Sequence, residues 1–233
     1  MDESSSSIIE SVRSLMPIST LYLLGRPLTD AEARLVTERQ AGELLRLLGI
    51  TKPSVEIELI AELPEIEISV IPDFPLSGSS EWTGDAWHIK INASDSLWRC
   101  RSTLAHELKH ILDDPFREEL YPGWPHGSTD TPPDQAEAIC EYFAGCVLVP
   151  RPWLNSVWDK GIRDPADLAS LFDVSQRLIE VRMDQTNVTS RPRTTKRLRR
   201  ASRRIYERRL PTAITALRQT IQPSQLAPCC TGQ

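Results

Sequence analysis

The chain has 233 residues, of which 40% are hydrophobic and 25% charged, an ordinary composition for a globular protein long enough to bury a core. No apolar run reaches the roughly 18 residues that cross a bilayer, and the opening MDESSSS lacks the charged-then-apolar pattern of a secretory signal. The five cysteines lack the even, short-range spacing of a disulfide framework, so reduced thiols are expected. These features argue against a membrane partner and predict a cytoplasmic protein.

The first part of the chain predicts an extension followed by a helix. Residues 1–28 are expected to be partly disordered, because they begin with an acidic, serine-rich stretch and Pro17 interrupts their helical pattern. Thr29 and Glu32 then form a capping-box pattern at the start of a clear amphipathic helix, and Gly49 stands where its C-terminal cap belongs.

The next segment predicts a small antiparallel sheet. Ser54 can cap a short helix that Pro64 ends. Residues 66–70 alternate with period two, which is typical of a strand, and two extended arms flank the turn at residues 84–85. Within the second arm, residues 86–92, the strand at residues 87–91 could pair with an extended substrate by its edge, or it could be an interior arm of the hairpin.

The sequence LAHELKH at residues 104–110 is the strongest chemical signal. Ser94 or Asp95 can cap a helix through this motif, and on that helix His106 and His110 share one face with Cβ atoms about 5 to 6 Å apart, close enough to bind one zinc ion. Glu107 could take a proton from zinc-bound water. The alternative is an ordinary helix with two solvated histidines, but only four histidines occur in the chain, so this spacing favours a metal site.

A second motif helix, from Asp134 to about Val149, follows a proline-rich loop expected over residues 113–133. Its Glu137 and Glu141 lie four apart, so one could bind zinc while the other hydrogen-bonds a ligand histidine and orients it. Either could instead be a solvated carboxylate. Cys140 could also bind the metal, although a lone cysteine on such a face is more often a small buried residue.

The C-terminal part predicts two short helices and a basic tail. Caps at Asp164 and Ser175 indicate a helix-turn-helix pattern over residues 165–183. Residues 191–210 hold ten Lys or Arg against one Glu, a balance of +9 that leaves −14 for the rest of the chain with its net charge of −5. An alternative function is therefore a DNA-binding transcriptional regulator that uses the helix pair and the tail, with a structural or sensory zinc site.

Three segments together resemble the ImmA/IrrE family of metallopeptidases. They are RCRSTLAHELKH (99–110), EAICEYFAGCVLVP (137–150) and LASLFDVSQRLIEVRM (168–183). The chain departs from the family pattern at Ser102, where a bulky aromatic is common, and at Lys109, where glycine is common. Neither departure removes a candidate ligand.

The resemblance implies a zinc-dependent endopeptidase of the gluzincin type with an α+β, mainly helical, zincin-like fold. It implies His106, His110 and Glu137 as metal ligands and Glu107 as the catalytic residue, while Glu141 takes the place of a common asparagine and suits a supporting role. Genes for family members often lie beside the gene for a helix-turn-helix repressor on a mobile element. The resemblance therefore implies such a repressor as the partner, which the peptidase would cleave as a protein substrate. No oxyanion donor is identifiable; Tyr121 and His126 are weak candidates, and a surface-loop residue is the favoured interpretation of each.

Together, pattern and resemblance predict four parts. These are an N-terminal extension (1–28), a zinc metallopeptidase domain (29–150), a C-terminal helical subdomain (151–190) and a basic helix with a flexible tail (191–233). Nucleic acid is a further candidate partner through the tail.

Overall fold

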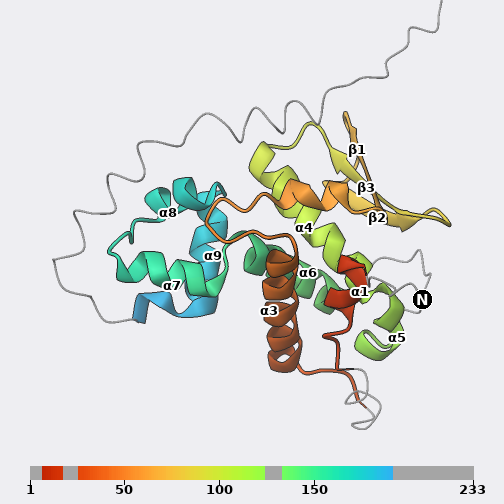
Figure 1. The fold of residues 1–233 in the computed structure, drawn as a ribbon, viewed down its shortest axis with the longest axis horizontal. Coiled ribbons are helices and arrows are strands. Elements are labelled where there is room, and N and C mark those ends of the chain that lie inside the picture. The colour runs from red at the N-terminus through yellow and green to blue at the C-terminus, as the bar shows by residue number, and fades with distance from the viewer. Residues whose placement is uncertain (1–6, 18–25, 124–132, 191–233) are drawn as a thin grey trace, which may run out of the picture.

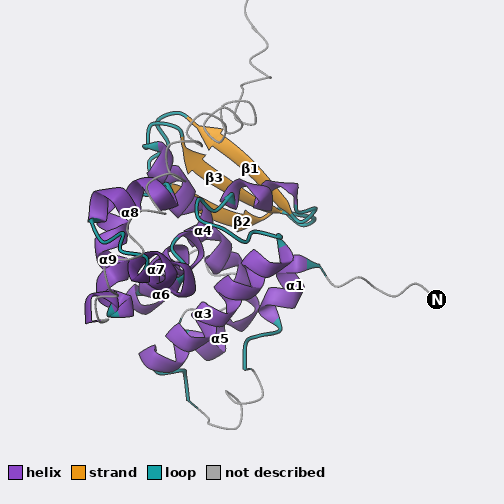
Figure 2. Ribbon diagram, turned by 60° about the vertical axis from the view of Figure 1, so that its left-hand side comes forward, coloured by secondary structure: helices purple, strands orange, loops and turns teal. Residues whose placement is uncertain are grey.

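A computed structural model describes residues 7–17, 26–123 and 133–190. Three strands lie together on one side of a larger group of helices (Figure 1), and a view from a second direction agrees (Figure 2). The fold is therefore α+β and mainly helical, as predicted. The helices and strands are α1 (Ile8–Arg13), α3 (Asp30–Leu47), η1 (Ile57–Glu62), β1 (Ile66–Ile71), β2 (Gly78–Trp82), β3 (Trp87–Asn92), α4 (Leu97–Asp113), η2 (Asp114–Phe116), α5 (Arg117–Leu120), α6 (Asp134–Leu148), α7 (Arg151–Asp159), α8 (Pro165–Phe172), α9 (Gln176–Thr186) and η3 (Val188–Ser190), where η marks a 3₁₀-helix.

The sheet is mixed, and the prediction of an antiparallel sheet was wrong for one of its two strand pairs. β2 and β3 form the expected antiparallel hairpin, in which Trp82 pairs with Trp87 and Gly78 with Ile91. β1 instead pairs in parallel with β3, with Ile66 opposite Trp87. The order β1-β3-β2 makes β3 the central strand, so the hairpin-interior alternative is the correct one for it and its edge cannot bind a substrate. Among the described strands, β2 is the strand of the hairpin that lies at the edge of the sheet.

Capping residues set the ends of several helices as predicted. Thr29 and Glu32 form a complete capping box at the start of α3, and Gly49 follows its end with a φ of +68°, a left-handed conformation that glycine adopts at low cost. Asp164 and Ser175 accept hydrogen bonds from the first-turn amides of α8 and α9. Each of these four ends is thus encoded locally.

Two other predicted caps were wrong. α4 begins after Ser96, whose side chain accepts a hydrogen bond from the amide of Arg99, and not after Ser94 or Asp95. Ser54 has a φ of +57° and caps no helix, and the element that follows is the 3₁₀-helix η1, which starts without a side-chain cap.

The proline-rich segment after the first motif is partly helical, so the prediction of a continuous loop was wrong for its first part. α4 continues to Asp113 and leads into η2 and α5. Pro115 stands in the first turn of η2, where the missing proline N–H removes no helical hydrogen bond. Residues 124–132 lie outside the described ranges.

α4 lies at the centre of the fold. It packs against β2 and β3 on one side and against α6 on the other (Figure 1). Its apolar stripe is buried, with Leu108, Ile111 and Leu112 almost inaccessible to solvent, and Phe143 of α6 is fully buried in the same core. Burying a side chain of this size contributes about 1.5 to 3 kcal/mol, so the α4–α6 contact is a major source of stability.

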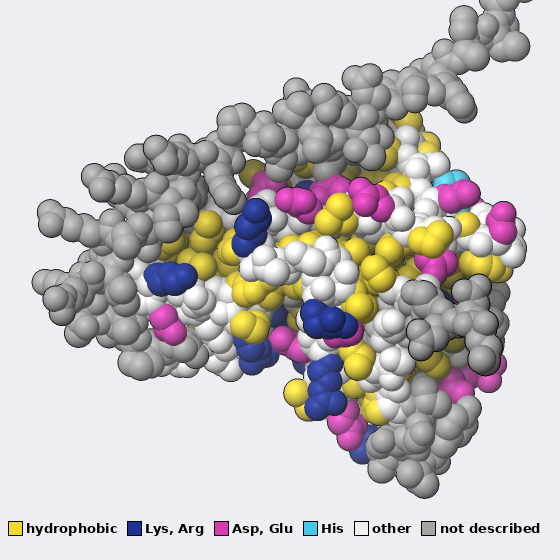
Figure 3. Space-filling model, in the orientation of Figure 1, with side chains coloured by type: hydrophobic (Ala, Val, Ile, Leu, Met, Phe, Trp, Pro, Cys, Tyr) yellow, Lys and Arg dark blue, Asp and Glu magenta, His cyan; other side chains and the backbone are white. Residues whose placement is uncertain are grey.

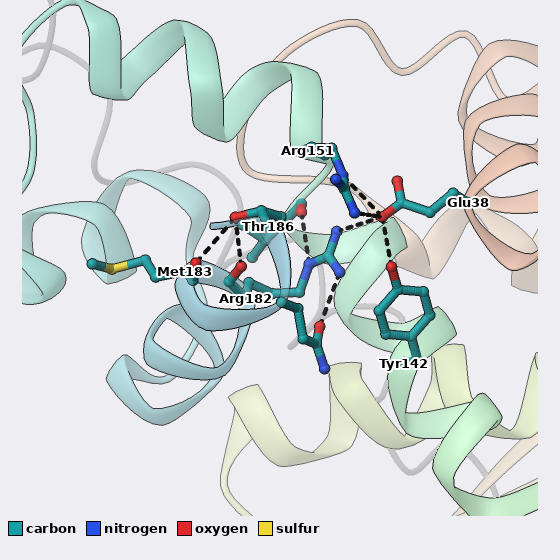
Figure 4. A network of polar contacts seen from close by, with 8 residues as sticks. Glu38, Tyr142, Arg151, Arg182, Met183 and Thr186 are labelled. Atoms are coloured by element: carbon teal, nitrogen blue, oxygen red, sulfur yellow. Dashed lines mark hydrogen bonds and ion pairs between the residues drawn. The ribbon is translucent and has the colours of Figure 1, made fainter. Parts of the chain in front are cut away.

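The C-terminal helices share this core and are also held by a polar network (Figure 4). Glu38 of α3 accepts a hydrogen bond from Tyr142 of α6 at 2.8 Å and forms ion pairs with Arg151 of α7 and Arg182 of α9 at 3.1 and 3.5 Å. Arg182 is fully buried and also donates to the carbonyl of Val149. One carboxylate therefore ties four helices together.

Charge is unevenly distributed over one face of the molecule. On the face drawn in Figure 3, acidic side chains form a row along the upper part, and most Lys and Arg side chains lie below it. The strongly basic residues 191–210 lie outside the described ranges, so the predicted basic helix and tail are not covered. Within the ranges that the structure describes, no helix combines the length and the apolar character that a bilayer-crossing segment needs.

Candidate metal centre

The two histidines of the first motif meet on one face of α4, as their spacing predicts. The Nε2 atoms of His106 and His110 lie 3.1 Å apart, and both side chains are only partly exposed. The two rings lie edge-on to each other with their centroids 4.8 Å apart. Both Nε2 atoms are therefore available to one shared ligand.

Glu137 of α6 reaches the same point. One of its carboxylate oxygens lies 3.3 Å from His106 Nε2 and the other lies 3.3 Å from His110 Nε2. Hydrogen bonding to His106 and His110 lowers the pKa of this carboxyl well below its ordinary value, although burial acts in the opposite direction. Glu137 is therefore an anion at neutral pH.

These separations fit a zinc ion. Zinc binds histidine nitrogen and carboxylate oxygen at about 2.0 to 2.2 Å in a tetrahedron, whose ligand atoms then lie roughly 3.3 Å from each other. The three separations here are 3.1, 3.3 and 3.3 Å. Two imidazoles and one carboxylate are also a ligand set that zinc accepts in catalytic sites, where a fourth position stays open.

Cys140 is a competing donor one turn along α6 from Glu137. Its sulfur, His106 and His110 offer donor atoms within 4.8 Å of one another. However, the sulfur lies 3.5 Å from His110 Nδ1, on the side of the ring away from the Nε2 atom that faces Glu137. Burial raises the pKa of the Cys140 thiol well above its ordinary value. The contact is thus better suited to orienting the His110 ring than to binding the ion that Nε2 would share.

Glu107 lies beside the histidines and contacts the sheet. It is buried, with 7% of its surface exposed, and its carboxylate accepts a hydrogen bond from Ser80 Oγ of β2 at 2.9 Å. Gly78 lets β2 approach this closely, because a Cβ atom there would lie 2.4 Å from Thr103 Cγ2 and 3.2 Å from a Glu107 oxygen. Ser80 and Gly78 were not singled out in the sequence, since only the strand-to-helix contact gives them a role.

Two other candidates do not make the contacts expected of them. Glu141 is exposed, and the hydrogen bonds found among the described residues include none between Glu141 and either histidine; the histidine contact belongs to Cys140 instead. Tyr121 is buried, and its hydroxyl donates to Asp113, so it does not point an oxyanion donor at the site. His126 lies outside the described residues.

Lys109 forms a separate buried cluster on α4. Its ammonium group lies 2.5 Å from Asp113 Oδ1 and donates to Gln40 of α3 at 2.8 Å, and Tyr121 donates to the other Asp113 oxygen at 2.8 Å. Lys109 stands where glycine is common in the resembled family. It is in fact almost fully buried, with an ion pair and a hydrogen bond to compensate its charge.

The candidate metal centre lies in a cleft of about 1750 Å³. β2 and α9 lie on different sides of the α4–α6 pair (Figure 1), and both contribute to its walls. The helix-turn-helix pattern did not predict that α9 faces this cleft. The residues that line it near the centre and on these two walls include His106, Glu107, His110, Glu137, Glu141, Leu76, Gly78, Ser80, Glu81, Trp82, Trp87, Ser175, Arg177, Leu178, Val181 and Gln185.

Comparisons with known proteins agree with the motifs. The model of the IrrE N-terminal-like domain, a peptidase family, matches residues 65–184, just over half of the chain. Comparison with the curated proteins gives no match. Among solved structures, a transcriptional regulator from Mycobacterium tuberculosis has a similar fold, with a TM-score of 0.50 and 16% sequence identity. The similarity covers 81% of this chain and 54% of the regulator, so this chain spans about half of that protein's length, and the likeness concerns the fold alone.

Proposed function

This chain belongs to the IrrE N-terminal-like family, and on that premise we propose that it is a zinc-dependent endopeptidase. The observation that carries the proposal is the meeting of three donors from two helices. His106, His110 and Glu137 direct two nitrogens and a carboxylate to one point in the cleft, at the separations that a tetrahedral zinc ion requires.

Glu107 is the proposed general base. Zinc held by the three ligands would lower the pKa of a bound water to about 7 and polarise the scissile carbonyl. Glu107 takes a proton from the attacking water and delivers it to the leaving amine. Its hydrogen bond to Ser80 supports this role, because it holds the carboxylate next to the histidines and limits its rotation.

The cleft supports a polypeptide substrate in extended form. β2 is an edge strand among the described strands, and its residues line the cleft beside the proposed base. An extended chain can add to such an edge through backbone hydrogen bonds, which leaves side chains to determine specificity. We therefore assign to β2 the substrate-pairing role that the sequence suggested for β3.

The proposed substrate is a protein, with a helix-turn-helix repressor of a mobile element or stress response as the first candidate. This identity rests on the family resemblance alone. The alternative, DNA binding through α8 and α9, is less favoured because Arg177, Leu178 and Val181 of α9 line the cleft and Arg182 is buried in the core. A role for residues 191–210 in binding nucleic acid is untouched by this argument.

Metal content tests the site. We expect about one zinc per chain in the purified protein, retention of zinc in Glu107→Gln, and loss of zinc in His106→Ala. Zinc retention in both variants, measured by elemental analysis after dialysis, would show that the ligand assignment is wrong.

Cleavage tests the reaction. A helix-turn-helix repressor encoded beside this gene should be cut at a defined bond by the zinc-loaded protein and should stay intact with Glu107→Gln. The fragments are identified by mass spectrometry. Equal cleavage by both proteins would mean that Glu107 is not the general base or that a contaminating protease cuts the repressor. In either case the assay would not support the proposed reaction.

A further inference from the structure

Two tryptophans form an exposed aromatic surface in the cleft. Trp82, at the end of β2, and Trp87, at the start of β3, are cross-strand partners with ring centroids 5.5 Å apart and planes tilted by 57°. Trp87 is partly buried, but 53% of Trp82 stays exposed despite this contact. Both residues line the cleft.

The alternation of β2 directs Trp82 to the same face as the proposed base. Successive strand side chains point to opposite faces, so Gly78, Ser80 and Trp82 share one face. Ser80 reaches Glu107, and a Cβ at Gly78 would touch Thr103 of α4, which identifies this face as the one that covers α4. Trp82 therefore lies on the α4 side of the sheet, two residues along the strand from the contact with Glu107.

That spacing determines which substrate side chain would meet the tryptophan. Two residues of a strand span roughly 6.6 to 6.8 Å, and an extended chain paired with β2 repeats its side-chain orientation at the same interval. With the cleaved bond close to Glu107, a side chain within about three residues of that bond comes to lie over Trp82.

We propose that Trp82, supported by Trp87, is a specificity-determining subsite that selects an apolar or aromatic side chain near the cleaved bond. The inference rests on the proposed endopeptidase function. Trp82 supplies a flat apolar surface, and Trp87 fixes its orientation through the tilted ring contact, so a substrate side chain that packs there removes apolar surface of both partners from water.

A merely structural role for the pair makes a different prediction. Cross-strand aromatic pairs stabilise hairpins, so loss of Trp82 would then lower stability without changing which peptides are selected. Selectivity is therefore the decisive measurement, and stability is the control.

The experiment uses the full chain and a positional-scanning library of short unstructured peptides. Cleavage by the zinc-loaded protein is read by mass spectrometry, and binding to Glu107→Gln is read by fluorescence anisotropy with the same peptides. We expect preference for Trp, Phe, Leu or Ile at one position within about three residues of the cleaved bond, and a roughly tenfold loss of that preference in Trp82→Ala.

Matched variants separate the subsite from general effects. Trp98→Ala removes a tryptophan of similar exposure, 49%, that does not line the cleft, and its peptide preference should equal that of the parent. Trp82→Phe should keep the apolar preference. Trp82→Glu should shift it toward Lys and Arg, a change that a folding defect cannot produce.

The outcomes distinguish the two proposals. Unchanged preference in folded Trp82→Ala and Trp82→Glu would overturn the subsite while leaving the peptidase intact. Absence of cleavage by the zinc-loaded parent, together with apolar selectivity in binding that depends on Trp82, would overturn the proposed reaction and support the subsite.

Discussion

Two clusters of polar side chains, each built on residues of α4, differ in how far they are exposed to solvent. Lys109 and Asp113 are only 2% and 3% exposed, and the charge of each is matched by the other and by neighbouring polar groups. His106, His110 and Glu137 are 18%, 10% and 43% exposed and direct their donor atoms at one point in the cleft.

The contrast separates a stabilising network from a binding site on the same helix. A buried ion pair is satisfied inside the protein and excludes further partners, whereas converging nitrogen and carboxylate donors at a cleft are suited to an ion from solution. Burial alone would have identified the wrong cluster as the functional one.

Removing the cation from the buried cluster of Lys109 and Asp113 should have the largest effect on stability. Lys109→Met leaves Asp113 buried without its cation, which should lower the free energy of unfolding by about 3 to 5 kcal/mol in urea titrations. The double variant Lys109→Met with Asp113→Asn should recover part of this loss, since no buried charge is left unpaired. A stability loss that the double variant fails to reduce would mean that packing, not charge, is the cause.

Removing a donor from the open cluster should instead affect metal binding. Glu137→Gln should weaken zinc binding by roughly 100-fold or more in competition with a chelator, whereas Cys140→Ser should cost at most about tenfold, because its sulfur contacts the far side of the His110 ring. Glu141→Gln, one turn along the same helix, is the matched control and should bind like the parent. The reverse order for Glu137 and Cys140 would identify the thiolate as the third ligand.

The Glu38 network predicts a pH-dependent contribution to stability. Burial alone would raise the pKa of Glu38, but the hydrogen bond from Tyr142 and the charges of Arg182 and Arg151 outweigh it and lower the pKa below 4.5. A lowered folded-state pKa contributes stability above the ordinary value that is lost as pH falls through the lowered one. Glu38→Gln should therefore cost about 2 kcal/mol at pH 7, and the difference from the parent should shrink below pH 4.5 in urea titrations at several pH values.

A surface pair provides the control for that measurement. Glu43 and Arg46 form an ion pair at the surface of α3, where solvent screens the charges, so Glu43→Gln should leave stability nearly unchanged across the same pH range. Equal effects of the two substitutions would show that the buried arginine adds nothing to the Glu38 interaction.

The smallest predicted effect concerns the hydrogen bond to Glu107. Ser80→Ala removes one hydrogen bond worth about 1 kcal/mol, so kcat should fall roughly fivefold while zinc content and KM stay unchanged. Ser79→Ala changes the neighbouring residue on the opposite face of β2 and should leave kcat intact. A matching fall in Ser79→Ala would indicate a general disturbance of the strand.

Helical spacing explains why part of the candidate centre could be predicted from sequence. Residues four apart on a helix must share a face, so the pairing of His106 with His110 depends on local geometry alone. Glu137 was identified with the help of the family resemblance, and its approach to the histidines depends on how α6 packs against α4. Glu141 was predicted to hydrogen-bond a ligand histidine, whereas the structure places the thiol of Cys140 against His110 Nδ1, a contact that also depends on how α6 packs.

Long-range contacts explain what could not be predicted. The alternation of residues 66–70 predicted a strand but carried no information on its direction relative to β3, so the parallel pair was missed. Ser94, Asp95 and Ser96 are all suitable caps, and only the last begins α4. The role of α9 in the cleft wall depends on its attachment through Arg182, which is fully buried and contacts Val149 and Glu38.

The absence of a side chain at Gly78 allows the short distance between β2 and α4. With Thr103 Cγ2 only 2.4 Å from where a Cβ would stand, any other residue at position 78 requires either the Thr103 side chain or the strand to move. If the strand moves outward, a polypeptide added to its free edge would move with it, away from the carboxylate of Glu107. How deeply a substrate is seated would thus be encoded by the one side chain that is missing from the strand.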